Sequence, residues 1–196
     1  RKEKTMKVTT GFSQPYMAKY KNEGGVVSYT DGKKVGRGVD VSISPESSDS
    51  STFYADNSKA EDVPGTFTGG TATLTIDGLE QEAEAMVSGT GEIDEAGWIH
   101  YDDAQETPFL GFGCVRRRMG GGKTTYQAIV LTKVSPQQIK DEAKTQEDTI
   151  EFQTTQIVLD LKRDDTAKHE WKRVGKDCET EKEAEDMIKT FFKISE

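Results

Sequence analysis

The stretch PFLGFGCVRRRMGGGKTTYQAIVLTKV, from Pro108 to Val134, decides the fold class of this 196-residue chain. Its two halves, residues 109–119 and 125–134, are rich in β-branched and aromatic residues, which favour strands. The glycines between the halves permit a turn without steric cost. The stretch therefore predicts a long antiparallel hairpin with Gly120–Gly122 at its tip.

The same glycines also suggest a phosphate-binding loop, because Gly122, Lys123 and Thr124 match the end of the pattern G-x-x-x-x-G-K-[ST]. That pattern needs a glycine where this sequence has Arg117. It also needs a helix after the loop, since the N-terminal amides of the helix bind the phosphates. The residues that follow are typical of a strand. We therefore expect no nucleotide binding.

Two further segments show the apolar and polar alternation of half-buried strands, namely GVDVSIS (residues 38–44) and TATLTI (residues 71–76). Ahead of the first, Asp31-Gly32 predicts a tight hairpin turn. The segment GWIHYDD (residues 97–103) predicts another short strand.

A last strand is predicted in DTIEFQTTQIVLDLKR, from Asp148 to Arg163. Its apolar residues change parity near Thr154 and Thr155. A β-bulge there, or a crossing between two packed sheets, would explain the change.

Two helices are predicted beside the strands. A short helix occupies residues 79–88, with apolar residues on one face and Gly89 as its stop. A C-terminal helix begins with a capping box formed by Thr180 and Glu183. Its apolar stripe is predicted to pack on the sheet and consists of Ala184, Met187, Ile188, Phe191 and Phe192.

The charge and composition of the chain argue against several classes of function. The net charge of −9 disfavours a general nucleic-acid binder, which normally has a basic surface. No apolar run approaches the roughly 18 residues of a membrane span, so no membrane partner is expected. The basic N-terminus lacks the apolar core of a secretory signal. Cys114 and Cys178 are expected to be reduced thiols.

No catalytic or metal site is expected. His100, His169 and the two cysteines lack the close spacing of metal ligands, and no serine occupies a G-x-S-x-G elbow. Arg116, Arg117 and Arg118 point alternately to opposite faces of their strand, which favours ion pairs across strands or subunits. The chain is therefore predicted to be a non-enzyme without a cofactor or metal.

The polar segment from Pro45 to Gly70 is too long for an ordinary connection. Long unstructured connections in compact domains are usually functional or disordered. We therefore expect this segment to have a role of its own.

Several segments together resemble the major tail protein family of long, non-contractile-tailed phages of Gram-positive bacteria. The similarity runs from about Tyr16 to the C-terminal helix, and its most specific parts are SSDSSTFYADN, the following FTGG, and IEFQT. The other parts are YTDGKKVGRGVDVSIS, TATLTIDGLEQEAEAMVSG, LGFGCVRRR and TYQAIVLTKV.

The resemblance implies a mainly β fold of the α+β class, a β-sandwich or open barrel with a short helix and a C-terminal helix packed on the sheet. It implies a structural virion protein whose hexameric rings stack into the tail tube. DNA would pass through that tube without sequence-specific binding. The further partners implied are the tape measure protein, the tail terminator and the distal tail protein. Subunits would be made and assembled in the bacterial cytoplasm.

Under this interpretation residues 1–15 are an N-terminal arm, and residues 16–196 are one tail-tube domain with an assembly loop at about 45–70. We expect the ring and stacking contacts to include Ser47, Asp49, Phe53, Tyr54, Asp56, Asn57, Phe67, Arg116, Arg118 and Lys123.

Two alternatives stay open. The first is a tube subunit of a phage-derived injection or secretion apparatus, which would share the ring but carry another cargo. The second is a carbohydrate-binding β-sandwich of a phage receptor-binding device. That device would need an exposed aromatic platform, and Phe53, Tyr54 and Trp98 are scattered along the sequence.

Overall fold

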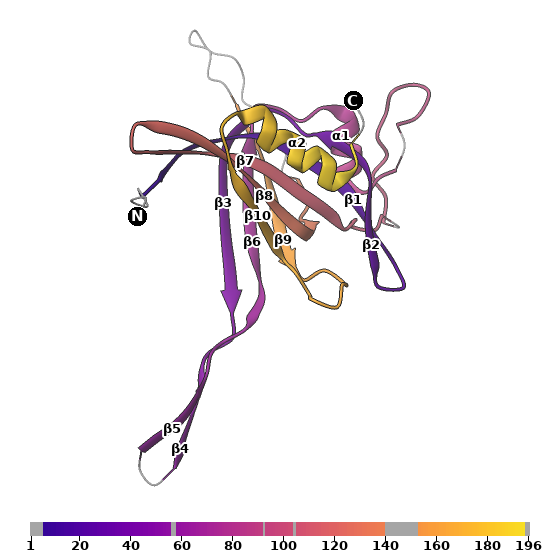
Figure 1. Cartoon of the computed structure of the whole chain (residues 1–196). Helices are drawn as coiled ribbons and strands as arrows, with labels where there is room; N and C mark the ends of the chain where they lie inside the picture. Colours follow the sequence, from indigo (N-terminus) through magenta and orange to yellow (C-terminus); the bar gives the residue numbers. More distant parts are fainter. Residues whose placement is uncertain (1–5, 56–57, 92, 104, 140–152, 195–196) are drawn as a thin grey trace.

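The computed structural model describes residues 6–55, 58–91, 93–103, 105–139 and 153–194, with the backbone alone for 51–55 and 58–63. The described chain is mainly β, as the sequence predicts (Figure 1). Its strands are β1 (Val8–Glu23), β2 (Val26–Lys34), β3 (Gly38–Ser47), β4 (Ser51–Ala55), β5 (Ser58–Val63), β6 (Phe67–Ile76), β7 (Leu110–Gly120), β8 (Lys123–Pro136), β9 (Thr155–Lys162) and β10 (Lys172–Cys178). The helices are α1 (Gln81–Ser88) and α2 (Glu181–Phe192).

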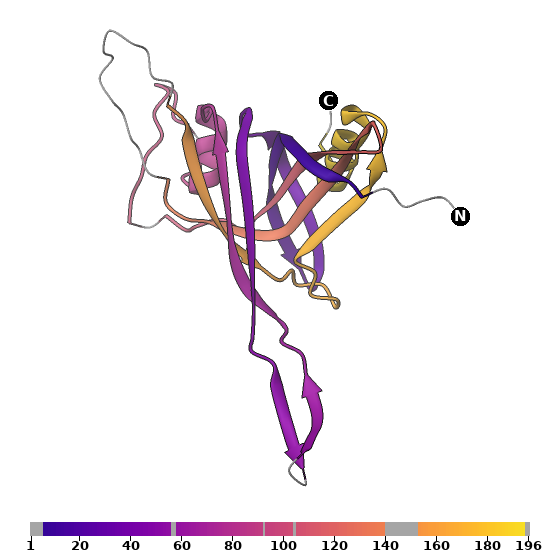
Figure 2. The same ribbon diagram turned by 90° about the vertical axis from the view of Figure 1, so that its left-hand side faces the viewer.

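Eight strands form one antiparallel sheet in the order β2-β1-β7-β8-β9-β6-β3, with β10 paired to β8 beside this path. The sheet curls, so that β3 returns toward β1 (Figure 2). The amide of Val35 donates to the carbonyl of Pro15 at 3.1 Å, and Gly38 faces the ring of Phe12. Of the two architectures implied by the resemblance, this curled single sheet corresponds to the open barrel.

The strands β7 and β8 form the predicted hairpin, closed by the pair Gly120 and Lys123. Gly121 and Gly122 have φ values of 59° and 73°. Positive φ at both central residues is what a two-residue type I′ turn requires. The glycines therefore serve the turn, and the prediction of a hairpin tip is confirmed.

The concave side of the sheet encloses the main core. Every second residue of β7 points into it, and Leu110, Phe112 and Cys114 are buried there. α1 lies at the end of the molecule away from the β4–β5 hairpin (Figures 1 and 2) and adds Met86 and Val87 to this core. Gly89 ends α1 in the left-handed conformation, as predicted. Strands β6 and β9 complete the core with Leu74, Ile76, Ile157 and Leu159.

The convex side carries a second core under α2 (Figure 1). Ala184, Ile188 and Phe192 of the predicted stripe are buried, whereas Met187 and Phe191 are partly exposed. The sheet residues beneath the helix include Gly111 and Gly113, which alternate with the inward side chains of β7. The missing side chains allow α2 to lie directly on the strand backbone.

The N-terminus of α2 confirms half of the capping box. The Thr180 hydroxyl accepts from the amide of Glu183 at 3.3 Å. The Glu183 carboxylate, however, accepts from the amide of Glu179 at 3.1 Å, one residue earlier than a capping box requires. The first bond satisfies a backbone donor that the helix itself leaves free, and the second satisfies the amide of the residue before the N-cap.

Gly113→Val is expected to destabilise the fold, because a Cβ at Gly113 would lie 2.7 Å from Ile188 Cγ2 and 2.9 Å from the Phe192 ring. Overpacking of this kind costs roughly 1–3 kcal/mol. Urea denaturation of the full chain measures the loss. Gly11→Val is the matched control, since a Cβ there meets only Arg117 Cβ at 4.0 Å. Equal stability of the two variants would contradict close packing of α2.

The predicted turn at Asp31-Gly32 is wrong, because both residues lie inside β2. In the register, Met17 pairs with Lys33 and Lys19 pairs with Thr30, so Ala18 alone faces Asp31 and Gly32. This is a β-bulge, and Asp31 adopts φ 54° within it. An Asp-Gly pair satisfies a bulge as well as a turn, since both need a left-handed residue. The turn between β1 and β2 contains Gly24 and Gly25 instead.

The predicted strand at residues 97–103 is also wrong. The Asp94 side chain accepts from the amides of Ala96 at 2.9 Å and Trp98 at 2.8 Å, and Gly97 donates to the Asp94 carbonyl at 2.9 Å. A side chain thus takes the donors that a strand partner would have used. The segment is a tight turn that presents Trp98 to solvent.

Strand β9 occupies the second half of the predicted last strand. It begins at Thr155, where the apolar parity changes, and pairs with β6 in one unbroken register. Residues 148–152 lie outside the described residues, so the predicted bulge is not seen within β9. Strand β10 follows β9, and the sequence patterns did not predict it.

The described part of residues 45–70 consists largely of paired β-strands, so the expectation of a connection without secondary structure is wrong there. Strands β3 and β6 pair as far as Ser47 and Phe67, and the amide of Ser48 donates to the carbonyl of Thr66 at 2.9 Å. Beyond them β4 and β5 pair as a separate two-stranded ribbon. This ribbon extends far from the body of the molecule (Figures 1 and 2).

Candidate functional site

The projecting ribbon, β4 and β5, contains two of the residues expected at subunit contacts. Phe53 and Tyr54 lie on β4, where only the backbone is described. Asp56 and Asn57 lie outside the described residues. Asp49 precedes β4 and is exposed. The fold thus places β4, with Phe53 and Tyr54, at a distance from the sheet (Figure 2).

The base of the ribbon is attached to the body. Ser47 is exposed and pairs with Phe67 across the hairpin. The Phe67 ring stacks on Trp171, with centroids 4.5 Å apart and planes 3° apart, and the Arg163 guanidinium lies 5.9 Å from its centroid. Phe67 therefore anchors the ribbon to the sheet, a role within the subunit that the sequence did not indicate.

A cluster of cationic side chains surrounds Gln127, in the half of β8 nearer the tip of the β7–β8 hairpin. Arg116 and Arg118 both donate to the Gln127 side-chain oxygen. Arg118 also reaches Asp177 at 3.2 Å, and Lys7 reaches the other oxygen of Asp177 at 3.0 Å. The two predicted arginines are thus brought together, and Arg118 makes an ion pair across strands of the kind that the sequence analysis expected, whereas Arg116 makes a hydrogen bond to Gln127.

The guanidinium group of Arg116 is only partly hydrogen-bonded. Its Nε atom is buried and has no hydrogen-bond partner. Burial and the charge of Arg116 lower the pKa of Lys172 below its ordinary value. Burial raises the pKa of the nearby Cys114 thiol to about 12, despite the two cations. A thiol with this pKa is inert at neutral pH, so Cys114 is a core residue rather than a nucleophile.

The ion pairs of Asp177 predict a pH-dependent contribution to stability. The Lys7 ammonium and Arg118 guanidinium lower the pKa of Asp177. A depressed carboxyl pKa stabilises the fold above the unfolded value of about 3.9, and this contribution is lost as the pH falls through the folded pKa.

Asp177→Asn is therefore expected to reduce the free energy of unfolding at pH 7 by at most about 1 kcal/mol, because the partners reach solvent. The difference from the unmodified chain should shrink as the pH falls below about 4. Urea denaturation across this pH range measures it. A difference in the free energy of unfolding that stays constant or grows as the pH falls would contradict the role of Asp177.

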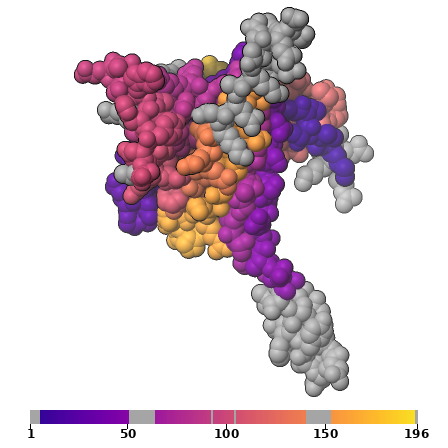
Figure 3. Space-filling view, turned by 180° about the vertical axis from the view of Figure 1, so that it is seen from behind, coloured from indigo at the N-terminus to yellow at the C-terminus, as the bar shows by residue number. Residues whose placement is uncertain are grey.

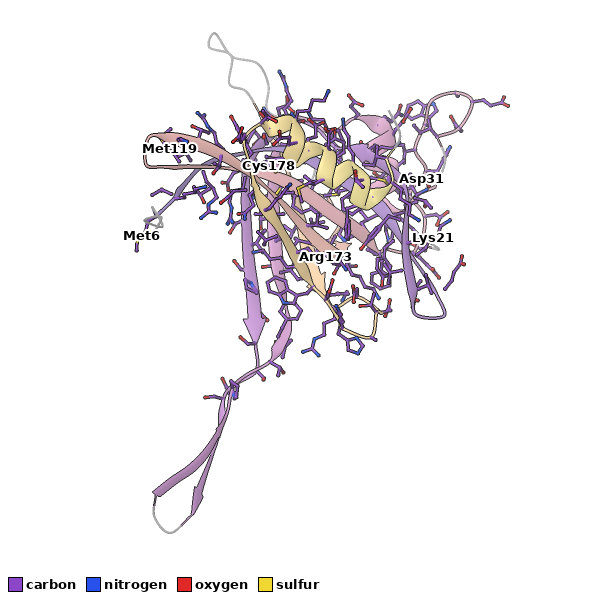
Figure 4. All side chains as sticks on the ribbon, in the orientation of Figure 1. Met6, Lys21, Asp31, Met119, Arg173 and Cys178 are labelled. Carbon is purple, nitrogen blue, oxygen red and sulfur yellow. The ribbon has the colours of Figure 1, made fainter. Side chains whose placement is uncertain are left out.

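The tip of the β7–β8 hairpin is cationic and partly apolar. Lys123 and Arg117 are exposed there. Val8 pairs with Met119, and their side chains are 68% and 44% exposed. Met6 is exposed nearby, and Figure 4 shows Met6 and Met119 at the same end of the molecule. Large apolar side chains in such positions indicate a contact surface.

Part of the expected N-terminal arm belongs to the sheet. Residues 8–15 lie in β1, and Val8 to Ser13 pair with β7. Residues 1–5 lie outside the described residues.

Cys114 and Cys178 are both free and buried. No described group of three or more His, Cys, Asp or Glu is placed to hold a metal ion. Within the described ranges, neither helix has the length and apolar character needed to cross a membrane.

No protein-family model matches the chain, and no curated protein matches it.

Lys7 and Asp177, which complete the cluster around Arg116 and Arg118, were missed by the sequence analysis. They lie 170 positions apart. No local spacing connects them, and they meet because β1 and β10 flank the β7–β8 hairpin. Lys172 was missed for the same reason.

Proposed function

We infer that this chain is a structural subunit that assembles with copies of itself into stacked hexameric rings, the tube of a long phage tail. The observation that carries this proposal is the ribbon β4–β5, which continues the β3–β6 pairing far beyond the core (Figure 1). Its sequence is also the part that most specifically resembles the tail-tube family. A projecting ribbon of this kind suits contact with a subunit of the next ring.

The ribbon is difficult to explain in an isolated subunit. A two-stranded hairpin alone in water is marginally stable at best, because it has no face packed on a core. Within the part of the chain that the structure describes, β4 and β5 pair only with each other. A second subunit would supply the missing face and would stabilise the extended conformation.

The edges of the sheet also favour assembly. The order of the strands leaves β2 and β3 at the two ends of the sheet. Val26 on β2 and Val39 on β3 are 70% and 57% exposed. Exposed edge strands with apolar residues tend to pair with another chain. In a ring of subunits such edges are covered by neighbours, so they need no other protection.

The charge of the chain fits a conduit for DNA. A net charge of −9 repels a polyanion, so DNA can pass without binding. The tape measure protein, the tail terminator and the distal tail protein are the further partners in this proposal, and the virion tail is the location.

Sedimentation velocity across a wide concentration range tests the proposal. We expect a monomer at low concentration, and ring-sized and larger species as the concentration rises. A single monomeric species at every concentration would contradict self-assembly.

A further inference from the structure

The surface of the subunit is divided by charge. From Ala60 to Val115 the sequence has no Lys or Arg, although the same stretch has twelve Asp or Glu. The stretch from Thr107 to Lys140 contains Lys and Arg but no Asp or Glu. The first stretch contains β6, α1 and the loop formed by residues 93–103 and 105–109, with nine of its twelve acidic residues at positions 80–106, and the second contains the β7–β8 hairpin.

These two regions lie at opposite ends of the molecule. The loop at residues 93–109 is at one side and the tip of the β7–β8 hairpin at the other (Figure 1). The view from behind agrees, because the loop and the start of β1 occupy opposite sides (Figure 3). The subunit therefore has an acidic end and a cationic end.

The acidic end presents an ordered aromatic residue. Trp98 is 68% exposed, although the Asp94 side chain and a hydrogen bond from Gln81 to Gly97 hold its turn. Tyr101 is 56% exposed, and its hydroxyl donates to Glu84 at 2.8 Å. Tryptophan and tyrosine in ordered positions are frequent centres of protein interfaces, because little conformational entropy is lost when they bind.

A hollow of about 510 Å³ adjoins this loop. Its carboxylates, on Glu84, Asp102 and Asp103, favour cationic side chains. Its lining includes Glu84, Tyr101, Asp102, Asp103, Gln105 and Gln137.

The cationic end offers matching chemistry. Arg117 and Lys123 are exposed, and no described ion pair occupies either of them. The exposed side chains of Val8 and Met119 lie beside them. Long cations next to apolar side chains complement carboxylates next to Trp98 and Tyr101.

We propose that the acidic end, at Glu95, Trp98 and Asp103, binds the cationic tip, at Arg117, Met119 and Lys123, of a second copy of this chain. Because the two surfaces are different and lie at opposite ends, the contact is head-to-tail. Repetition of such a contact closes a ring when the rotation between subunits permits it. This inference rests on the proposed ring assembly and assigns the contact between neighbours within one ring.

Two charge-reversal variants test the contact. Glu95→Lys with Asp103→Lys makes both ends cationic, and Arg117→Glu with Lys123→Glu makes both ends acidic. Each variant alone is expected to need a concentration more than about tenfold higher to assemble, because like charges face each other. Sedimentation velocity measures that concentration.

An equimolar mixture of the two variants is expected to assemble as the unmodified chain does. Each reversed end then meets the oppositely reversed end of the other variant, so subunits alternate around the ring. Lys21→Glu with Lys168→Glu is the control, since it changes the charge equally at exposed positions elsewhere. It should assemble normally.

The outcomes separate this inference from the proposed function. If the unmodified chain assembles but the mixture does not, or if each variant assembles alone, the assigned contact is wrong and the tube proposal stands. If the unmodified chain stays monomeric under all conditions, both are wrong. Circular dichroism confirms that each variant is folded before it is compared.

Discussion

Replacement of residues 48–66 by a two-residue Asn-Gly turn is expected to abolish tube formation while leaving the subunit folded. Ser47 and Phe67 pair across the hairpin, so a type I′ turn can close the strands at that point. The remaining sheet keeps both described cores, because none of the residues that the structure shows in these cores belongs to residues 48–66. Electron microscopy and urea denaturation measure the two properties.

The result distinguishes assembly from folding. We expect the free energy of unfolding to change by less than about 1 kcal/mol, since a shorter loop also costs less entropy on closure. A control that replaces only residues 24–25 with Asn-Gly keeps the ribbon and should still form tubes. Normal tubes from the ribbonless chain would remove the ribbon from the stacking contact.

Phe192→Ala is expected to destabilise the fold by about 3–5 kcal/mol, the largest effect of any single substitution proposed here. Phe192 is 1% exposed and lies with its ring centroid 5.0 Å from that of Tyr29. Its ring also covers Gly111 and Gly113, so the substitution leaves a cavity over the strand backbone. Thermal and urea denaturation measure the loss.

Phe109→Ala is the matched control, because Phe109 is 42% exposed and the Lys133 ammonium lies over its ring, 4.4 Å from the centroid. It should cost about 1 kcal/mol or less. If Phe192→Ala costs no more than this control, α2 does not hold the outer face of the sheet as the packing indicates.

Elements with local signals were predictable from the sequence. The β7–β8 hairpin follows from strand-forming residues around glycines, and α2 follows from its cap at Thr180 and its apolar repeat. The short helix α1 was predictable because Gly89 marks its end. In each of these elements the signal lies within about fifteen residues, so no knowledge of the partner element is needed.

Strand β1 was not predictable, because its central residues are buried on both sides. Met17 points into the main core, whereas Tyr16 and Ala18 lie in the core under α2. The alternation that identifies a half-buried strand is therefore absent. A register shift between Ser13 and Tyr16 disturbs the pattern further. Strand β10 is mostly exposed and polar, so hydrophobic periodicity could not detect it.

The candidate site was predictable only in part. The polar segment at residues 45–70 indicated a functional element by its length, but its strands depend on continued pairing from β3 and β6 rather than on burial. The arginines of β7 were identified, whereas Lys7 and Asp177 join them only through the sheet. The turn at Asp94 replaced an expected strand because a side chain satisfied the backbone there.

Negative-stain electron microscopy of the concentrated full chain tests the central claim most directly, because rings, tubes and monomers differ in shape at this scale. The account predicts hollow tubes of one constant diameter, built from stacked rings. Only compact monomers, at every protein concentration, pH and salt concentration tried, would contradict it.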